Sequence, residues 1–168
     1  MMLCQFTVKN FQCFRDETTF DLQATNISEH DESLITNVDG EKFLPLGVIY
    51  GPNGAGKSTV LHSMYTLITK IMRPICAVGC DNEECLKKNG NAYINPFRFD
   101  KESINNPTEF ELFFRTEKNE YQYLISFLKN KVVNEELYRK SISGSRYSTL
   151  FNAETTERLN SRDRKSVV

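Results

Sequence analysis

The stretch that decides the fold is Gly51-Pro52-Asn53-Gly54-Ala55-Gly56-Lys57-Ser58. It satisfies the pattern G-x-x-x-x-G-K-[ST], the Walker A or phosphate-binding loop. Glycines let the backbone approach a phosphate closely. The N–H groups of such a loop then point inward and form a nest for an anion. The sequence therefore predicts a phosphate-binding loop, or P-loop, over residues 51–58.

Individual side chains of the loop have distinct predicted roles. We expect Lys57 to reach the β- and γ-phosphates of a nucleotide as a point charge, which makes it the candidate catalytic residue. The Ser58 hydroxyl is the candidate metal ligand, because Mg²⁺ bridges phosphate oxygens at this position. The loop thus implies a bound nucleotide together with Mg²⁺. The predicted nucleotide-binding residues are Gly51, Asn53, Gly54, Ala55, Gly56, Lys57, Ser58 and Thr59.

The flanks of the loop support this interpretation. Leu46–Tyr50 is a short apolar run, typical of a strand covered on both faces in a parallel sheet. After the loop, apolar residues recur at helical spacing until Pro74, which ends the helix. The predicted apolar helix face consists of Val60, Leu61, Met64, Leu67, Ile68, Ile71 and Met72. A strand–loop–helix order is the context that a true phosphate loop requires, and it disfavours a fortuitous Gly-rich turn.

The rest of the chain is mostly strands. Alternating apolar residues predict two strands before the loop, Leu3–Val8 and Thr18–Leu22. An irregular insertion is expected over about 75–107, because this segment has few large apolar residues. A β meander is expected over about 109–152, since its short separators suit hairpins. The predicted strands are Glu109–Arg115, Tyr121–Leu128, Lys131–Tyr138 and Leu150–Phe151.

Together these features resemble the start of an ABC-type ATPase head, and more narrowly the RecF/SMC/OLD-like branch that is grouped with the AAA family. In that branch the loop reads G-x-N-G-x-G-K-S, and Asn53 and Ala55 match it. The resemblance also rests on Asn10-Phe11-Gln12-Cys13-Phe14, Phe20-Asp21-Leu22 and Pro96–Asp100, and it covers roughly residues 2–152. The implied fold is α/β, a P-loop NTPase with a mixed sheet around the Walker A helix and an antiparallel β meander.

The resemblance implies ATP binding, head-to-head homodimerisation, and a role in DNA repair and maintenance or in defence against phage. The family hydrolyses ATP with a signature loop, an apolar strand ending in Asp-Glu (Walker B) and a later catalytic His. We find none of these parts in the sequence, and no run of four apolar residues ending in Asp-Asp or Asp-Glu follows Ser58. We therefore expect residues 1–162 to be the N-terminal lobe of an incomplete head. The full-length parent would be an ATPase, whereas this lobe alone would be inactive, and DNA would contact the missing regions.

The last six residues suggest why the head is incomplete. Asp163-Arg164-Lys165-Ser166-Val167-Val168 is what one reading frame of a widely used sequencing adapter would encode. We therefore expect residues 163–168 to be a non-native tail, the alternative being an ordinary polar terminus.

Composition narrows the class of protein further. The 168 residues suit about one domain. With 21 basic and 22 acidic residues, the net charge is −1, which excludes binding of nucleic acid through bulk charge. No apolar run is long enough to span a bilayer. The N-terminus does not resemble a signal peptide, so no membrane partner and a cytoplasmic location are expected.

Other residues carry weaker predictions. Cys4 and Cys13 are interpreted as small core residues, and Cys76, Cys80 and Cys85 as incidental thiols, with a zinc site as the alternative. Phe11 and Phe14 either anchor the core or border the adenine base. His30 and His62 are interpreted as surface or helix-face residues. Ser141–Ser145 lacks the Leu and second Gly of a signature loop. A solvated strand edge explains the basic residues Lys129, Lys131, Arg139, Lys140 and Arg146.

Two other functions stay open. The chain could be a nucleotide-responsive binding switch without turnover of its own, which the downstream sequence would distinguish from an ATPase. A P-loop kinase or GTPase fits less well, because about 45 residues of strand-rich sequence precede the loop and no Asn/Thr-Lys-x-Asp-like base reader is present.

Overall fold

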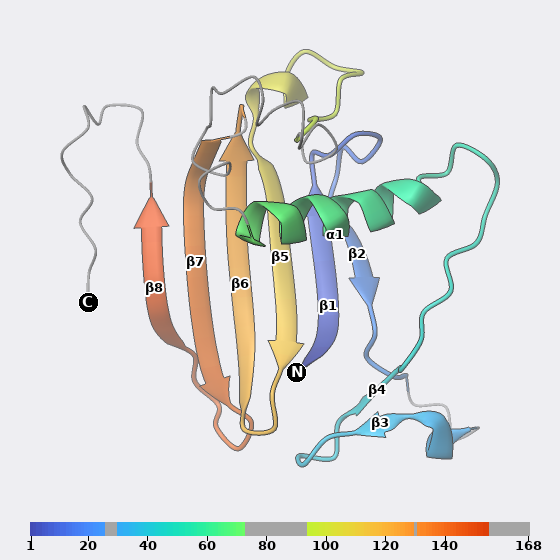
Figure 1. Ribbon diagram of the computed structural model, residues 1–168, viewed down its shortest axis with the longest axis vertical. Helices are drawn as coiled ribbons and strands as arrows, with labels where there is room; N and C mark the ends of the chain where they lie inside the picture. Colours follow the sequence, from blue (N-terminus) through green and yellow to red (C-terminus); the bar gives the residue numbers. More distant parts are fainter. Residues whose placement is uncertain (26–29, 73–93, 130, 155–168) are drawn as a thin grey trace.

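The computed structural model describes residues 1–25, 30–72, 94–129 and 131–154. Its longest elements are one helix and the strands of one large sheet (Figure 1). The helices are α1 (Lys57–Met72) and the short 3₁₀ turns η1 (Asp31–Ser33) and η3 (Ser103–Asn105). The strands are β1 (Met2–Lys9), β2 (Thr18–Asp21), β3 (Ile35–Thr36), β4 (Lys42–Phe43), β5 (Thr108–Arg115), β6 (Asn119–Leu128), β7 (Lys131–Ser141) and β8 (Ser148–Glu154).

Six strands form the main sheet in the order β2-β1-β5-β6-β7-β8. Except for Leu46–Tyr50, the predicted strands are confirmed as β1, β2, β5, β6, β7 and β8, because period-two alternation identifies strands with one face toward the core. The predicted mixed sheet is wrong for the described residues, since every strand pair among them is antiparallel. Leu46–Tyr50, the run predicted as a strand of a parallel sheet, pairs with no described strand.

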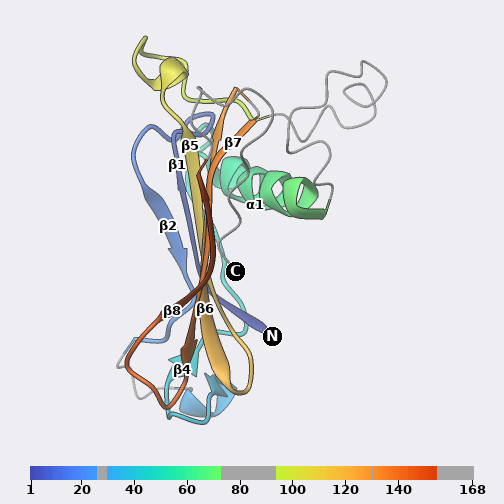
Figure 2. The same cartoon turned by 90° about the vertical axis from the view of Figure 1, so that its left-hand side faces the viewer.

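The core lies between α1 and one face of the sheet. Register pairs Phe6 with Leu112 and Val8 with Phe110, so these side chains share that face. Phe11, beyond the end of β1, is fully buried in the same cluster. Viewed edge-on, the sheet is a single layer with α1 on one side only (Figure 2). The core is therefore one apolar layer under one helix.

Helix α1 is confirmed, and its predicted apolar face is buried only in part: Leu67 lies in the core and Met64 packs against it. The residues that it buries are Ser63, Thr66, Leu67 and Lys70. Leu61 and Ile68 are 64% and 60% exposed. Periodicity alone did not choose the buried side, because apolar residues occupy more than one side of this helix. Ser63 can be buried at low cost, since its hydroxyl donates to the Val60 carbonyl at 2.7 Å.

The strand predicted at Leu46–Tyr50 is also wrong for the described residues. The segment between β4 and α1 forms no ladder with any of them, and Val48 and Tyr50 are 75% and 90% exposed. It packs locally where Gly47 meets Phe20 of β2. A Cβ at Gly47 would lie 2.5 Å from the Phe20 ring. Apolar composition predicted a covered strand, but no described strand lies beside this segment to provide backbone partners.

Candidate functional site

Residues 51–56 form an irregular loop that ends where α1 begins, at Lys57. Gly54 and Gly56 have φ values of 84° and 85°, in the left-handed region that favours glycine. Gly56 is also closely packed, because a Cβ there would lie 2.8 Å from Cε1 of Phe14 and 3.1 Å from Sγ of Cys13. The loop sequence is therefore matched to its backbone at both positions.

Backbone donors gather at this end of α1. The N–H groups of Thr59 and Val60 donate to the Gly56 carbonyl, at 2.9 and 3.2 Å. By contrast, several neighbouring N–H groups donate to no backbone carbonyl of the described residues, namely those of Asn53, Gly54, Gly56, Lys57 and Ser58. Unpaired N–H groups at a helix N-terminus, together with the helix dipole, favour an anion. This arrangement can bind a phosphate group.

Lys57 folds back over the loop. Its Nζ donates to the carbonyl oxygens of Gly51 and Pro52, at 2.8 and 2.7 Å. This places the ammonium group beside the start of the loop. Ser58 is exposed in the first turn of α1, and Thr59 accepts a hydrogen bond from the Cys13 thiol at 3.3 Å. The structure thus brings all the sequence-predicted site residues together at one end of α1.

The five-residue segment Asn10–Phe14 lies against this loop. Phe11 anchors the core, as one of its two interpretations proposed, whereas Phe14 is half-buried behind Gly56. The predicted core position of Cys13 is wrong. Its side chain is exposed because it points from the turn toward Thr59. His62 lies on the helix face, as predicted, and its Nδ1 is 2.6 Å from the side-chain amide nitrogen of Gln12.

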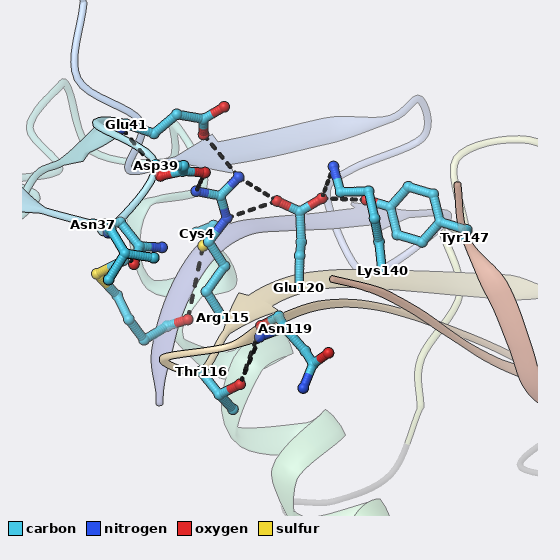
Figure 3. Close-up of polar contacts among 12 residues, drawn as sticks. Cys4, Asn37, Asp39, Glu41, Arg115, Thr116, Asn119, Glu120, Lys140 and Tyr147 are labelled. Carbon is cyan, nitrogen blue, oxygen red and sulfur yellow. Dashed lines mark hydrogen bonds and ion pairs between the residues drawn. The ribbon is translucent and has the colours of Figure 1, made fainter. Parts of the chain in front are cut away.

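A second polar cluster lies at the other end of the sheet (Figure 3). Arg115 is only 4% exposed, and its guanidinium contacts three carboxylates, those of Asp39 at 3.0 Å, Glu41 at 2.9 Å and Glu120 at 2.5 Å. It also lies over the Phe43 ring, 5.1 Å from the centroid. Because Asp39 and Glu41 lie between β3 and β4, Arg115 ties that hairpin to the main sheet.

Opposing effects set the pKa values of this cluster. Burial alone would raise the pKa of Glu120, but hydrogen bonds from Lys140, Tyr147 and Arg115 outweigh it and lower the pKa to about 2 from 4.5. Burial raises the pKa of the Cys4 thiol to about 11, although Arg115 opposes that rise. Glu120 is therefore ionised at neutral pH, as a buried partner of Arg115 must be.

The basic residues of the meander do not form one site. Strand β7 is not an edge strand, because β8 covers it, so the predicted solvated edge is wrong. Successive residues of a strand face opposite sides of the sheet, which separates Arg139 from Lys140. Lys140 also pairs with Glu120 at 2.8 Å. The structure therefore shows no single basic patch on β7.

The metal prediction and the tail fall on other parts of the chain. The described residues do not include Cys76, Cys80 and Cys85 or most of the predicted insertion. They also do not include residues 163–168. Within the described ranges, no three His, Cys, Asp or Glu side chains are grouped as a metal site would need. None of the helices described is long and apolar enough to cross a bilayer.

Two residues that organise the molecule, Asn10 and Arg115, received no structural role from the sequence, and Asn10 entered only as part of the resemblance. Asn10 is buried, and its side-chain nitrogen lies 2.8–3.2 Å from the carbonyl oxygens of Ser103, Asn106 and Pro107. These three partners are 93–97 residues away from Asn10 in the chain, and Arg115 is 76 residues away from its partner Asp39. No local pattern connects such positions. A polar residue at the end of an apolar strand was the available signal for each.

Comparison with known proteins gives a family. No curated protein matches the chain. A protein-family model described as an AAA domain matches residues 5–166, which is nearly the whole sequence and includes the loop at the start of α1. The chain therefore belongs to the AAA domain family, whose members are generally ATPases.

Proposed function

We propose that this chain binds Mg²⁺-ATP through residues 51–59. The observation that carries the proposal is the set of N–H groups at the start of α1 that donate to no backbone carbonyl of the described residues, with the Lys57 ammonium held at the start of the same loop. Phosphate oxygens would accept from the N–H groups of Asn53, Gly54 and Gly56, whereas the Ala55 N–H already donates to the Pro52 carbonyl at 3.3 Å. The Gly51 backbone would form the start of the loop, and Thr59 would stabilise the first turn of α1.

Lys57 would change partners when phosphate binds. In the structure its ammonium group satisfies two loop carbonyls, those of Gly51 and Pro52. A bound triphosphate offers anionic acceptors within the same reach, and hydrogen bonds between charged groups are stronger than those to neutral carbonyls. We expect Lys57 to turn toward the β- and γ-phosphates and to neutralise their charge.

The chemistry of the donor set fits Mg²⁺. A hydroxyl on the first turn of α1, at Ser58, suits a hard cation that takes oxygen ligands and keeps most of its shell as water and phosphate oxygens. When bound, Mg²⁺ would neutralise charge on the phosphates. Among this chain's residues, Ser58 would hold the ion, and no other described residue is assigned to it.

Turnover is proposed only for a longer parent protein. Hydrolysis needs a group that orients the attacking water, and no apolar strand ending in Asp-Glu follows Ser58 in the sequence. In that parent, a RecF/SMC/OLD-like head, ATP would drive head-to-head dimerisation and support DNA maintenance or defence against phage. The alternative is a binding switch that responds to nucleotide without hydrolysing it.

The test is calorimetric titration of the full chain with ATP, with and without Mg²⁺. We compare the wild type with Lys57→Ala and with Lys101→Ala, which removes an exposed lysine from the turn before η3. Lys57→Ala should weaken binding by about tenfold or more, equivalent to about 1.4 kcal/mol, whereas Lys101→Ala should not. Equal affinity of the wild type and Lys57→Ala would refute the role assigned to Lys57.

A further inference from the structure

The tight turn at Asn10–Phe14 has an unusual backbone. Phe11 and Phe14 exchange two backbone hydrogen bonds of 2.8 Å each, which close the turn. Asn10 and Gln12 have positive φ values, 54° and 51°. Residues with a Cβ seldom adopt this conformation, and proteins retain it where surrounding contacts hold it, often at functional sites. The contacts of this turn therefore matter.

On one side the turn contacts the phosphate loop and α1. The Phe14 ring occupies the space where Gly56 would carry a Cβ, with Cε1 2.8 Å from that position. The Cys13 thiol donates to the Thr59 hydroxyl at 3.3 Å. The Gln12 amide lies 2.6 Å from Nδ1 of His62, beyond the first turn of α1. Three consecutive residues of the turn thus support the loop and the start of the helix.

On the other side the same turn holds the segment 94–107. The Gln12 N–H donates to the Asn95 carbonyl at 2.8 Å. Asn10 Oδ1 accepts from the Phe97 N–H at 3.0 Å. Asn10 Nδ2 reaches the carbonyls of Ser103, Asn106 and Pro107, at 2.8, 2.9 and 3.2 Å. The same five-residue turn therefore contacts both the phosphate loop and the segment 94–107.

We propose that the Asn10–Phe14 turn positions the phosphate loop and couples its occupancy to the segment 94–107. Phe14 and Gln12 act as positioning residues: Phe14 fixes the backbone at Gly56, and Gln12 links α1 to Asn95. This inference rests on the proposed nucleotide binding. A loop held in its binding conformation loses less entropy when phosphate binds, so removing the support weakens binding.

The test compares Phe14→Ala, Phe14→Leu and Gln12→Ala with a matched control, Phe114→Ala. Phe114 is also a half-buried phenylalanine packed on the core, but it pairs with Leu3 at the opposite end of β1 from the turn. Each full-chain variant is titrated with Mg²⁺-ATP, and its free energy of unfolding is measured in urea. Amide hydrogen exchange is followed at residues 54–60 and 95–97, with and without Mg²⁺-ATP.

In the wild type, Mg²⁺-ATP should slow exchange both at 54–60 and at 95–97. Phe14→Ala should weaken Mg²⁺-ATP binding about five- to tenfold, and Phe14→Leu should restore part of it. Phe114→Ala should lower stability without this loss of affinity. Gln12→Ala should keep the slowing at 54–60 and lose it at 95–97.

Equal Mg²⁺-ATP affinities for Phe14→Ala and Phe114→Ala would overturn the positioning role. Slowing at 54–60 with unchanged exchange at 95–97 in the wild type would overturn the coupling. Failure of the proposed function looks different, because the wild type itself would then not bind Mg²⁺-ATP. In that case, amide exchange without nucleotide still tests whether the turn holds the phosphate loop. Phe14→Ala should then accelerate exchange at 54–60 more than Phe114→Ala does. Equal acceleration by the two variants would show that the turn does not hold the loop.

Discussion

Replacing Glu120 with glutamine tests the charge cluster of Figure 3 and gives a stability loss that depends on pH. Glu120 is nearly buried and receives hydrogen bonds from Arg115 at 2.6 Å and from Tyr147, with Lys140 at 2.8 Å. Glu120→Gln keeps the shape of the side chain and removes the charge. Arg115 retains Asp39 and Glu41, so no buried cation is left without a partner.

The magnitude follows from the pKa of Glu120, which the folded protein lowers from 4.5 to about 2. Each pKa unit is worth about 1.4 kcal/mol, so the ionised carboxylate contributes on the order of 3 kcal/mol at pH 7. Because the folded pKa is depressed, this contribution is complete above the unfolded pKa of 4.5 and is lost as pH falls toward 2. At pH 3 roughly 1 kcal/mol should remain.

The assay is urea unfolding followed by circular dichroism, for the wild type and Glu120→Gln at pH 7 and pH 3. Glu117→Gln is the control, because Glu117 is exposed in the turn between β5 and β6 and should change stability by less than about 0.5 kcal/mol. A loss for Glu120→Gln below about 1 kcal/mol at pH 7, or a loss equal at the two pH values, would refute the reasoning.

Three further substitutions test other parts of the structure. Gly56→Ala and Gly40→Ala both place a Cβ at a positive φ, 85° and 84°, and each should lower the free energy of unfolding by about 1–2 kcal/mol. Only Gly56 has close neighbours, so calorimetry should show Mg²⁺-ATP binding lost in Gly56→Ala alone. Equal binding by both variants would contradict the packing argument. Thr66→Val should raise the free energy of unfolding by about 1 kcal/mol, because the buried Thr66 hydroxyl has no hydrogen-bond partner in the described structure; a lower melting temperature would show that the hydroxyl is satisfied. Asn10→Ala should lower the free energy of unfolding, measured in urea, by about 3 kcal/mol and should speed proteolysis within 94–107, since it leaves several carbonyls and the Phe97 N–H unpaired. Its control is Asn105→Ala, which removes one exposed hydrogen bond and should leave stability nearly unchanged.

The sequence predicted the sheet better than the helix packing. Alternation identified β1 and β5 to β7, because one face of each packs against the core, with buried residues in β1, β5 and β6 and partly buried ones in β7. Helical periodicity located α1 and its buried Leu67, but it did not separate the covered apolar residues from the exposed ones. Ser63 and Thr66 face the sheet while Leu61 and Ile68 face outward. Periodicity reports that apolar residues share a side, and only the tertiary partners decide which side is covered.

For the candidate site, the contiguous part was predictable and the supporting part was not. The loop from Gly51 to Ser58 is read directly from a local pattern, since its chemistry fixes residue types at fixed spacing. The support for Gly56 comes from Phe14, some forty residues earlier, and the support for that turn comes from the segment 94–107. These contacts depend on the register of β1 with β5, which no local pattern of residues specifies.

The most direct test of the central claim is to observe the loop amides while Mg²⁺-ATP binds. In an NMR titration of the full chain, the amide resonances of Gly54, Gly56, Lys57 and Ser58 should move strongly, because their N–H groups acquire phosphate acceptors. The amides of β7 should not move. Saturation with Mg²⁺-ATP that shifts other resonances and leaves these four unchanged would contradict the account, since nucleotide would then bind elsewhere.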